Sequence, residues 1–346
     1  MVNMVGKVGV KVPDLYELLV REKFVRGVLV SNLTDIWYFP LEDGLEGLLE
    51  YYEELIIGVG EGNGFLIKKF PHKTYAISPI NDKLYVGLIY TKDKELRSLY
   101  VLGSDGWELK LHPILDAHRS AGAILDIAQL GPEFGRKVVV GGSTMVFSDV
   151  DGNQLIPFED FKRKGIYGVD SVVYGDNGGL FLEVMYVSLE HGLVRVVYED
   201  GKFGLGEEIL HYDVMHTQKS RTRFLGWYEN DTPLVISTVH LNYLVVNNKM
   251  VIGSDIVEND DYYTRLVILN NDVEKKLVDV LVGSEWFYDI IYMEINYEDP
   301  EKPVVVKTKN IKMKDVITGW PPTVYDLNVV RSKKLHEMLM SLKGKG

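Results

Sequence analysis

Two-residue turn signals recur along this chain at intervals of about 42 to 51 residues. Most contain Asn-Gly or Asp-Gly, which adopt the positive φ angles that a tight β-hairpin turn requires. A short apolar run precedes each turn. A repeat of this period is typical of a unit built from four antiparallel strands. The turns are Asn63-Gly64, Asp105-Gly106, Asp151-Gly152, Asp200-Gly201, Asn247-Asn248 and Glu298-Asp299.

The segments around these turns are apolar runs of about four to eight residues joined by short polar links. Parallel βαβ units need helices of about 10 residues or more between strands, so the pattern favours antiparallel meanders. The chain is therefore interpreted as one repeat domain over residues 1–346, closed by a strand and a helix over 311–346. The six units are expected at 27–70, 73–115, 121–160, 165–212, 221–258 and 262–310.

The five units over 73–309, and the unit before them, resemble the blades of a β-propeller. The resemblance rests on turn spacing and strand order over about four-fifths of the chain, and no named blade motif is matched. This pattern of turns and strands is similar to that of poorly characterised archaeal propeller proteins. It implies an all-β fold, a β-propeller with six blades or alternatively seven, and short helices near the N- and C-termini.

Two helices are expected near the N-terminus, over 13–26 and 45–55, and the second interrupts the first unit. Ser332 begins an expected C-terminal helix whose apolar residues would pack on the body or on a partner. The sequence leaves open whether a strand such as Thr323–Val330 pairs with the N-terminal segment to close the ring. The alternative is a seventh unit formed by the two ends.

Composition excludes several classes of function. The chain has no cysteine, which excludes disulfides, zinc-thiolate sites, iron–sulfur clusters and thiol nucleophiles. A net charge of −12 disfavours general binding of nucleic acid. No uncharged apolar run approaches the roughly 20 residues needed to cross a bilayer, so a soluble, cytoplasmic protein without a membrane partner is expected. Glutamine is scarce beside Lys and Glu, a bias that favours a thermophilic source.

Propellers place ligands on the face formed by blade-to-blade links and by the loops between second and third strands. Five of the eight histidines are expected on that face. Converging imidazoles suit a divalent metal ion or an acid–base pair near neutral pH. The competing interpretation is that these histidines share no function, because histidine is common in polar loops. The candidate metal ligands are His72, His118, His191, His216 and His240.

Arginine and glutamine side chains near the same links indicate a site for a small anionic ligand, such as a sugar carboxylate or a phosphate. The competing interpretation pairs these arginines with aspartates and glutamates of neighbouring loops. The candidate ligand-binding residues are Arg119, Gln218, Arg221 and Arg223.

The leading functional hypothesis is a non-catalytic binding or assembly module with a protein partner or a small anionic ligand. Its alternative follows from the resemblance to lyases and lactonases on propeller scaffolds. That alternative is a metal-assisted lyase or hydrolase of an anionic carbohydrate or lactone, using His118, His216 and His240. The sequence assigns no cofactor with certainty, and the metal-assisted alternative would require one divalent metal ion. The oligomeric state is left open.

Overall fold

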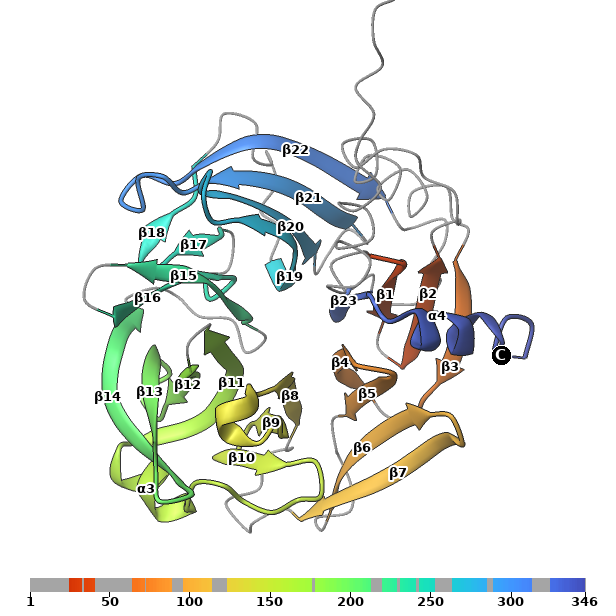
Figure 1. Ribbon diagram of the computed structural model, residues 1–346, viewed down its shortest axis with the longest axis horizontal. Helices are drawn as coiled ribbons and strands as arrows, with labels where there is room; N and C mark the ends of the chain where they lie inside the picture. The colour runs from red at the N-terminus through yellow and green to blue at the C-terminus, as the bar shows by residue number, and fades with distance from the viewer. Residues whose placement is uncertain are drawn as a thin grey trace, which may run out of the picture.

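The structure is a computed structural model. It describes residues 25–32, 34–40, 64–71, 73–88, 96–113, 123–175, 178–212, 220–228, 231–240, 243–252, 263–284, 289–312 and 324–345. Six sheets stand around one central axis, as Figure 1 shows in a view down the shortest dimension of the molecule. The predicted all-β, six-bladed β-propeller is therefore confirmed, and the seven-bladed alternative is not.

The sheets are numbered as blades in chain order, with the innermost strand of each given first. Blade 1 contains β23 (Asp326–Val330), β1 (Gly27–Asn32), β2 (Asp35–Pro40) and β3 (Phe65–Lys69). Blade 2 contains β4 (Thr74–Ile80), β5 (Lys83–Leu88), β6 (Leu96–Gly103) and β7 (Gly106–Pro113). Blade 3 contains β8 (Ile124–Gln129), β9 (Val138–Gly142) and β10 (Val146–Asp149).

The other three blades each contain four antiparallel strands. Blade 4 contains β11 (Ile166–Gly175), β12 (Gly179–Tyr186), β13 (His191–Glu199) and β14 (Lys202–Tyr212). Blade 5 contains β15 (Thr222–Tyr228), β16 (Thr232–Ser237), β17 (Val245–Val246) and β18 (Lys249–Met250). Blade 6 contains β19 (Tyr263–Asp272), β20 (Leu277–Ser284), β21 (Asp289–Asn296) and β22 (Val304–Lys312).

The recurring turns join the third and fourth strands of a blade, which explains why they appear once per repeat. Asp200 and Gly201 connect β13 to β14 with φ angles of 50° and 76°. Both angles are positive, as a type I′ hairpin turn requires. Gly64 is described next to β3, whereas Asn63 lies outside the described residues.

The C-terminal strand closes the ring. β23 pairs with β1 in antiparallel register, from Gly27 opposite Val330 to Ser31 opposite Asp326. The innermost strand of blade 1 therefore comes from the end of the chain, and its other three strands come from the beginning. This pairing answers the question that the sequence left open for Thr323–Val330.

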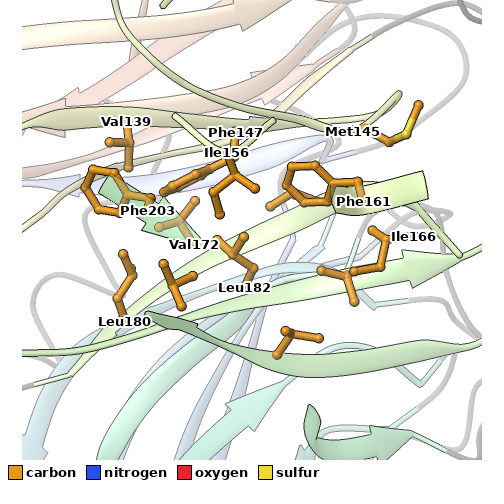
Figure 2. Packing of buried hydrophobic residues seen from close by; sticks show 14 of the residues in the cluster. Val139, Met145, Phe147, Ile156, Phe161, Ile166, Val172, Leu180, Leu182 and Phe203 are labelled. Atoms are coloured by element: carbon orange, nitrogen blue, oxygen red, sulfur yellow. The ribbon is translucent and has the colours of Figure 1, made fainter. Parts of the chain in front are cut away.

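Blade 3 departs from the four-stranded pattern. Its predicted fourth strand is reduced to a single bridge between Ser148 and Gln154, after which the chain forms helix α3 (Phe158–Arg163). The 3₁₀ helix η1 (Pro132–Phe134) lies earlier in the chain, between β8 and β9. Figure 2 shows Phe161 of α3 packed with Phe147 of blade 3 and Leu182 of blade 4. Helix α3 thus contributes Phe161 to the apolar cluster between blades 3 and 4.

Six separate clusters of buried apolar side chains lie between neighbouring blades, one at each interface. Helix α4 (Lys333–Met340) joins the cluster between blades 1 and 2 through Leu335 and Leu339, both fully buried. The Ser332 hydroxyl accepts a hydrogen bond from Leu335 N at 3.1 Å and caps the helix. The C-terminal helix therefore packs on the body.

Both helices expected near the N-terminus, over 13–26 and 45–55, fall on or largely on residues outside the described ranges. Within the described part of the chain, the helices are too short or too polar to span a bilayer.

Candidate functional site

Charged side chains gather where the six innermost strands meet. We call five of them the axial charge layer, and they come from β8, β19, β23 and the beginning of β15. Four of the five are completely buried, and the fifth keeps 23% of its side-chain exposure. The layer consists of Asp126, Arg221, Arg223, Arg265 and Asp326.

Arg221 crosses the propeller axis. It precedes β15 in blade 5, yet its Nη2 lies 3.0 Å from Asp326 Oδ2 in blade 1. Its Nη1 lies 3.4 Å from Asp126 Oδ1 in blade 3. One guanidinium group therefore connects three blades.

Arg223 forms a two-pronged ion pair with Asp126. Its Nη1 and Nη2 lie 3.0 and 3.1 Å from the two carboxylate oxygens. Burial alone would raise the pKa of Asp126, but the charges of Arg221 and Arg223 hold that pKa at about 2. The carboxylate is therefore ionised across the physiological range.

The same carboxylates bind the backbone of the next blade. Asp126 Oδ2 accepts a hydrogen bond from Val172 N at 3.0 Å, and Asp326 Oδ2 accepts one from Ile77 N at 2.8 Å. A buried N–H without a partner is costly, so each aspartate satisfies a donor as well as a cation. The aspartates thus fasten neighbouring innermost strands to one another.

Arg265 lies on β19 and contacts carbonyl groups of two other blades. Its Nη1 donates to Ser220 O at 2.6 Å, and its Nη2 donates to Tyr75 O at 3.3 Å. Burial and the nearby charge of Arg221 lower its pKa to about 10. The guanidinium still carries its charge at neutral pH, although carbonyl dipoles are its direct partners.

A second buried cluster lies beside this layer, between blades 4 and 5. His191 Nδ1 lies 3.4 Å from Asp170 Oδ2 and 3.8 Å from Glu183 Oε1. The Ser220 hydroxyl donates to Glu183 Oε1 at 2.6 Å, and the Ser171 hydroxyl donates to Glu183 Oε2 at 2.8 Å. All five side chains are nearly or completely buried.

These acidic and basic groups shift one another's protonation. Burial raises the pKa of Asp170 to about 6. Burial also opposes ionisation of Glu183, but His191 and the two hydroxyl donors keep its pKa below the usual value. The two carboxylates raise the pKa of His191 against the effect of burial. The cluster therefore takes up protons close to neutral pH.

Only part of the predicted site lies within the described residues. Arg221 and Arg223 both pair with aspartates, and contact of either with a ligand stays a prediction. His191 belongs to the buried cluster above. His240 follows β16 with its ring 4.9 Å from that of Tyr243, and burial lowers its pKa. The predicted residues outside the described ranges are His72, His118, Arg119, His216 and Gln218.

Within the described ranges, no group of three or more His, Asp and Glu side chains is arranged to hold a metal ion. Three of the five candidate histidines lie outside those ranges, so the metal site stays a prediction.

Sequence reasoning did not select Asp126, Asp170, Arg265 or Asp326. Each is a charged residue inside an apolar innermost strand, as in Leu125-Asp126-Ile127. A charge repeated at that position of several blades is a signal that points toward the axis, because alternate residues of an innermost strand face inward.

A different surface lies on the rim, where blades 5 and 6 meet. We call it the seam patch, and it consists of the exposed apolar residues Met250, Ile252, Val304 and Val306. Ile252 pairs with Val304 through a parallel bridge, supported by the bond from Val305 N to Ile252 O at 3.0 Å. Figure 1 shows β22 as the outermost strand there. Between 43% and 60% of each side chain is exposed.

Exposed lysines and one ion pair lie on the same strands as the seam patch or next to them. Lys302, Lys307 and Lys309 are exposed on or next to β22, and Lys249 Nζ lies 2.6 Å from Glu301 Oε2. The whole chain carries a net charge of −12, so a basic strip is unlike the average surface. Exposed apolar patches bordered by polar and charged residues are typical of an interaction surface.

No protein-family model and no curated protein matches the chain. Among solved structures, a Saccharomyces cerevisiae assembly of Dbp5 with Nup159, Gle1, IP6 and ADP is similar at 11% identity and a TM-score of 0.37, covering 75% of this chain and 72% of that chain. The computationally designed Ika8 protein is also similar, at 11% identity and a TM-score of 0.37, over 82% of this chain and 74% of its own.

A hypothetical selenium-binding protein from Sulfolobus tokodaii matches at 10% identity and a TM-score of 0.27, over 82% of this chain and 74% of that chain. Similarities this weak carry no argument about function.

Proposed function

We propose that the protein is a non-catalytic β-propeller that binds a protein partner through the seam patch. The partner segment presents apolar side chains flanked by carboxylates to the outer edge of β22. The observation that carries the proposal is the group of four exposed apolar side chains across two blades, with exposed lysines on or next to the same outermost strand.

The axial charge layer supports a structural role for the axis. Arg221 and Arg223 form ion pairs with Asp126 and Asp326, and the two aspartates also accept hydrogen bonds from backbone N–H groups. These interactions join innermost strands of different blades. A rigid ring of this kind suits a scaffold that displays a binding surface on its outside.

Charge complementarity supports an acidic partner. Lys302, Lys307 and Lys309 project from the edge region of β22, whose outer side meets only the bridge at Ile252 among the described residues. An extended segment that adds to a sheet edge gains main-chain hydrogen bonds, and its side chains supply specificity. Carboxylates next to the lysines would steer the encounter.

The test compares Val306→Glu with the matched control Leu109→Glu. Leu109 is exposed on β7, the outermost strand of blade 2, and is 46% exposed against 56% for Val306. Each variant is immobilised beside the wild type and exposed to lysate of the source organism. We expect an acidic protein that the wild type and Leu109→Glu retain, that Val306→Glu loses, and that cross-links to Lys302, Lys307 or Lys309.

Equal retention by all three proteins would overturn the proposal. A wild-type dimer in light scattering that Val306→Glu abolishes would also overturn it, because the seam patch would then bind a second copy. Retention should weaken at about 0.5 M salt, where screening reduces the attraction between the lysines and carboxylates.

The source and location belong to the same proposal. The glutamine-poor, Lys- and Glu-rich composition supports a thermophilic source. The archaeal source and the cytoplasmic location are proposals that rest on the resemblance to archaeal propeller proteins and on the sequence expectation of a soluble chain. A melting temperature above about 80 °C would agree with a thermophilic source, and one inside the mesophilic range of about 45–65 °C would contradict it.

A further inference from the structure

A cavity of about 520 Å³ lies on the outer part of blade 4, and we call it the blade 4 cleft. One side of it is formed by β12, β13 and β14, and the other includes Lys164 and Gly165, which connect α3 to β11. The β12–β13 hairpin and this blade-to-blade link both border it, so it belongs to the face on which ligands were expected. Its volume is in the range of small-molecule sites.

One face of the blade 4 sheet forms the floor of the cleft. Gly192 on β13 lies opposite His211 on β14. A Cβ atom at position 192 would collide with Glu208 Oε1 and with Tyr186 Cε2. The missing side chain therefore makes room for the Glu208 carboxylate and the Tyr186 ring. Val194, two residues further along β13, lies on the same face and supplies an apolar part of the floor.

Hydrogen bonds hold Tyr186, Glu208 and His211 together as one unit. The Tyr186 hydroxyl donates to Glu208 Oε1 at 2.9 Å, and His211 Nδ1 lies 3.0 Å from the same oxygen. The rings of Tyr186 and His211 are stacked, with centroids 6.2 Å apart and an angle of 26° between their planes. Burial and the nearby Glu208 raise the pKa of Tyr186, so its hydroxyl keeps the proton that it donates. A carboxylate is thus fixed beside flat aromatic surface.

A second carboxylate, that of Glu190, comes from the β12–β13 hairpin. Its Oε2 accepts a hydrogen bond from the Ser188 hydroxyl at 2.8 Å and lies 3.9 Å from His211 Nε2. The His211 imidazole therefore stands between two carboxylates. A neutral imidazole has a single N–H and can donate to only one of them.

The wall of the cleft has an excess of negative charge. Among the described residues, neither Glu190 nor Glu208 is paired with a lysine or an arginine. Lys164 is the one lysine or arginine among the described lining residues, and its Nζ donates to Gly206 O at 2.6 Å. Two carboxylates thus face one ammonium group. Within the described part of the chain, Glu208 Oε2 and Glu190 Oε1 accept no hydrogen bond and are available to a ligand.

We infer that the blade 4 cleft binds a small aliphatic molecule that carries a guanidinium group. Its N–H donors meet the available oxygens of Glu208 and Glu190, since a guanidinium fork matches carboxylate oxygens. Its planar face lies against the ring surface of Tyr186 and His211, as cations do on aromatic side chains. The aliphatic part contacts Val187 and Val194. This site is on a different blade from the seam patch and does not depend on the proposed protein partner.

Arginine and citrulline separate the contribution of charge from that of shape. The two molecules have nearly the same outline, but citrulline has an uncharged ureido group in place of the guanidinium. Calorimetry on the full chain should give a dissociation constant below about 1 mM for arginine. Citrulline should bind at least about tenfold more weakly, because the two carboxylates would then face an uncharged group.

Substitutions on β14 locate the binding. Glu208→Gln keeps the shape of the side chain and removes its charge, and it should weaken arginine at least about tenfold. The matched control is Glu207→Gln, because Glu207 is the preceding residue, does not line the cleft, has 73% of its side chain exposed and lies 3.7 Å from Arg195 Nε. This control should bind arginine like the wild type. Glu190→Gln should weaken arginine as Glu208→Gln does, and melting curves show whether each variant is folded.

The inference fails if arginine does not bind at about 10 mM, or if citrulline binds as tightly as arginine. It also fails if Glu208→Gln and Glu190→Gln bind like the wild type, or if Glu207→Gln loses as much affinity as they do. Zn²⁺ alone is the remaining probe, and stoichiometric Zn²⁺ that displaces arginine would overturn the inference in favour of a metal site. Should Glu208→Gln not fold, Glu190→Gln still decides the outcome. None of these results bears on retention of a partner by the seam patch.

Discussion

The substitution Asp126→Asn tests whether the axial charge layer holds the blades together. Asp126 is completely buried, pairs with Arg221 and Arg223, and accepts a hydrogen bond from Val172 N. Asparagine keeps an oxygen for Val172 N but removes the negative charge. Arg221 then keeps its ion pair with Asp326, whereas Arg223 loses its carboxylate partner.

The expected cost has a lower and an upper bound. The pKa of Asp126 falls from 3.8 to about 2. Each unit corresponds to about 1.36 kcal/mol, so loss of the charge costs about 2 kcal/mol at neutral pH. Removing one partner of a buried ion pair costs about 3–5 kcal/mol, because the other charge stays buried. We expect Asp126→Asn to lose between about 2 and 5 kcal/mol of unfolding free energy.

The pH dependence gives a second, independent measurement. A carboxyl group with a depressed folded pKa stabilises the protein above its unfolded pKa, and this contribution disappears as the pH falls through the folded pKa. For Asp126 the window runs from about pH 4 to about pH 2. The difference between wild type and Asp126→Asn should therefore shrink across this window.

Denaturant unfolding followed by tryptophan fluorescence measures both effects. The control is Asp151→Asn, whose aspartate has 66% of its side chain exposed and pairs with Lys110 at the surface. We expect the control to change stability by less than about 1 kcal/mol. The reasoning is refuted if Asp126→Asn lies within about 0.5 kcal/mol of the wild type at pH 7, or if its deficit does not shrink between pH 4 and pH 2.

Two further predictions concern the buried acid cluster and the C-terminal helix. Burial raises the pKa of Asp170 in the folded protein to about 6, so on acidification the folded state binds a proton at a higher pH than the unfolded state does. The unfolding free energy should therefore rise as the pH falls from about 6 to about 4. Asp170→Asn should remove this part of the rise in melting temperature, and an unchanged pH profile of the variant would contradict the prediction. Leu335→Ala should cost about 2–5 kcal/mol, because Leu335 is fully buried between α4 and blades 1 and 2, whereas the exposed Leu189→Ala should cost less than about 1 kcal/mol in the same denaturant assay.

The repeat could be predicted from the sequence because its signals depend on residue types that are close together in the chain. Positive φ angles at Asp200 and Gly201 are a property of those residue types, and alternating apolar residues define a strand wherever it finally packs. In blade 4 the turn at Asp200-Gly201 accordingly joins two such strands, β13 and β14. The departure in blade 3 was not predicted, since the residues after Gln154 form α3 only where the packing around Phe147 leaves room for Phe161.

The sequence by itself determined the period of the repeat, the antiparallel character of the sheets and the presence of the C-terminal helix. Only the tertiary structure decided that β23 enters blade 1 beside β1, and that Asp326 lies 3.0 Å from Arg221 across the axis. A cavity of about 380 Å³ likewise brings together Asn81, Gln129 and Arg331, which are far apart in the chain. The physical reason is that turn geometry and strand alternation depend on neighbouring residues, whereas ring closure and charge pairing depend on distances that exist only after the six blades have packed.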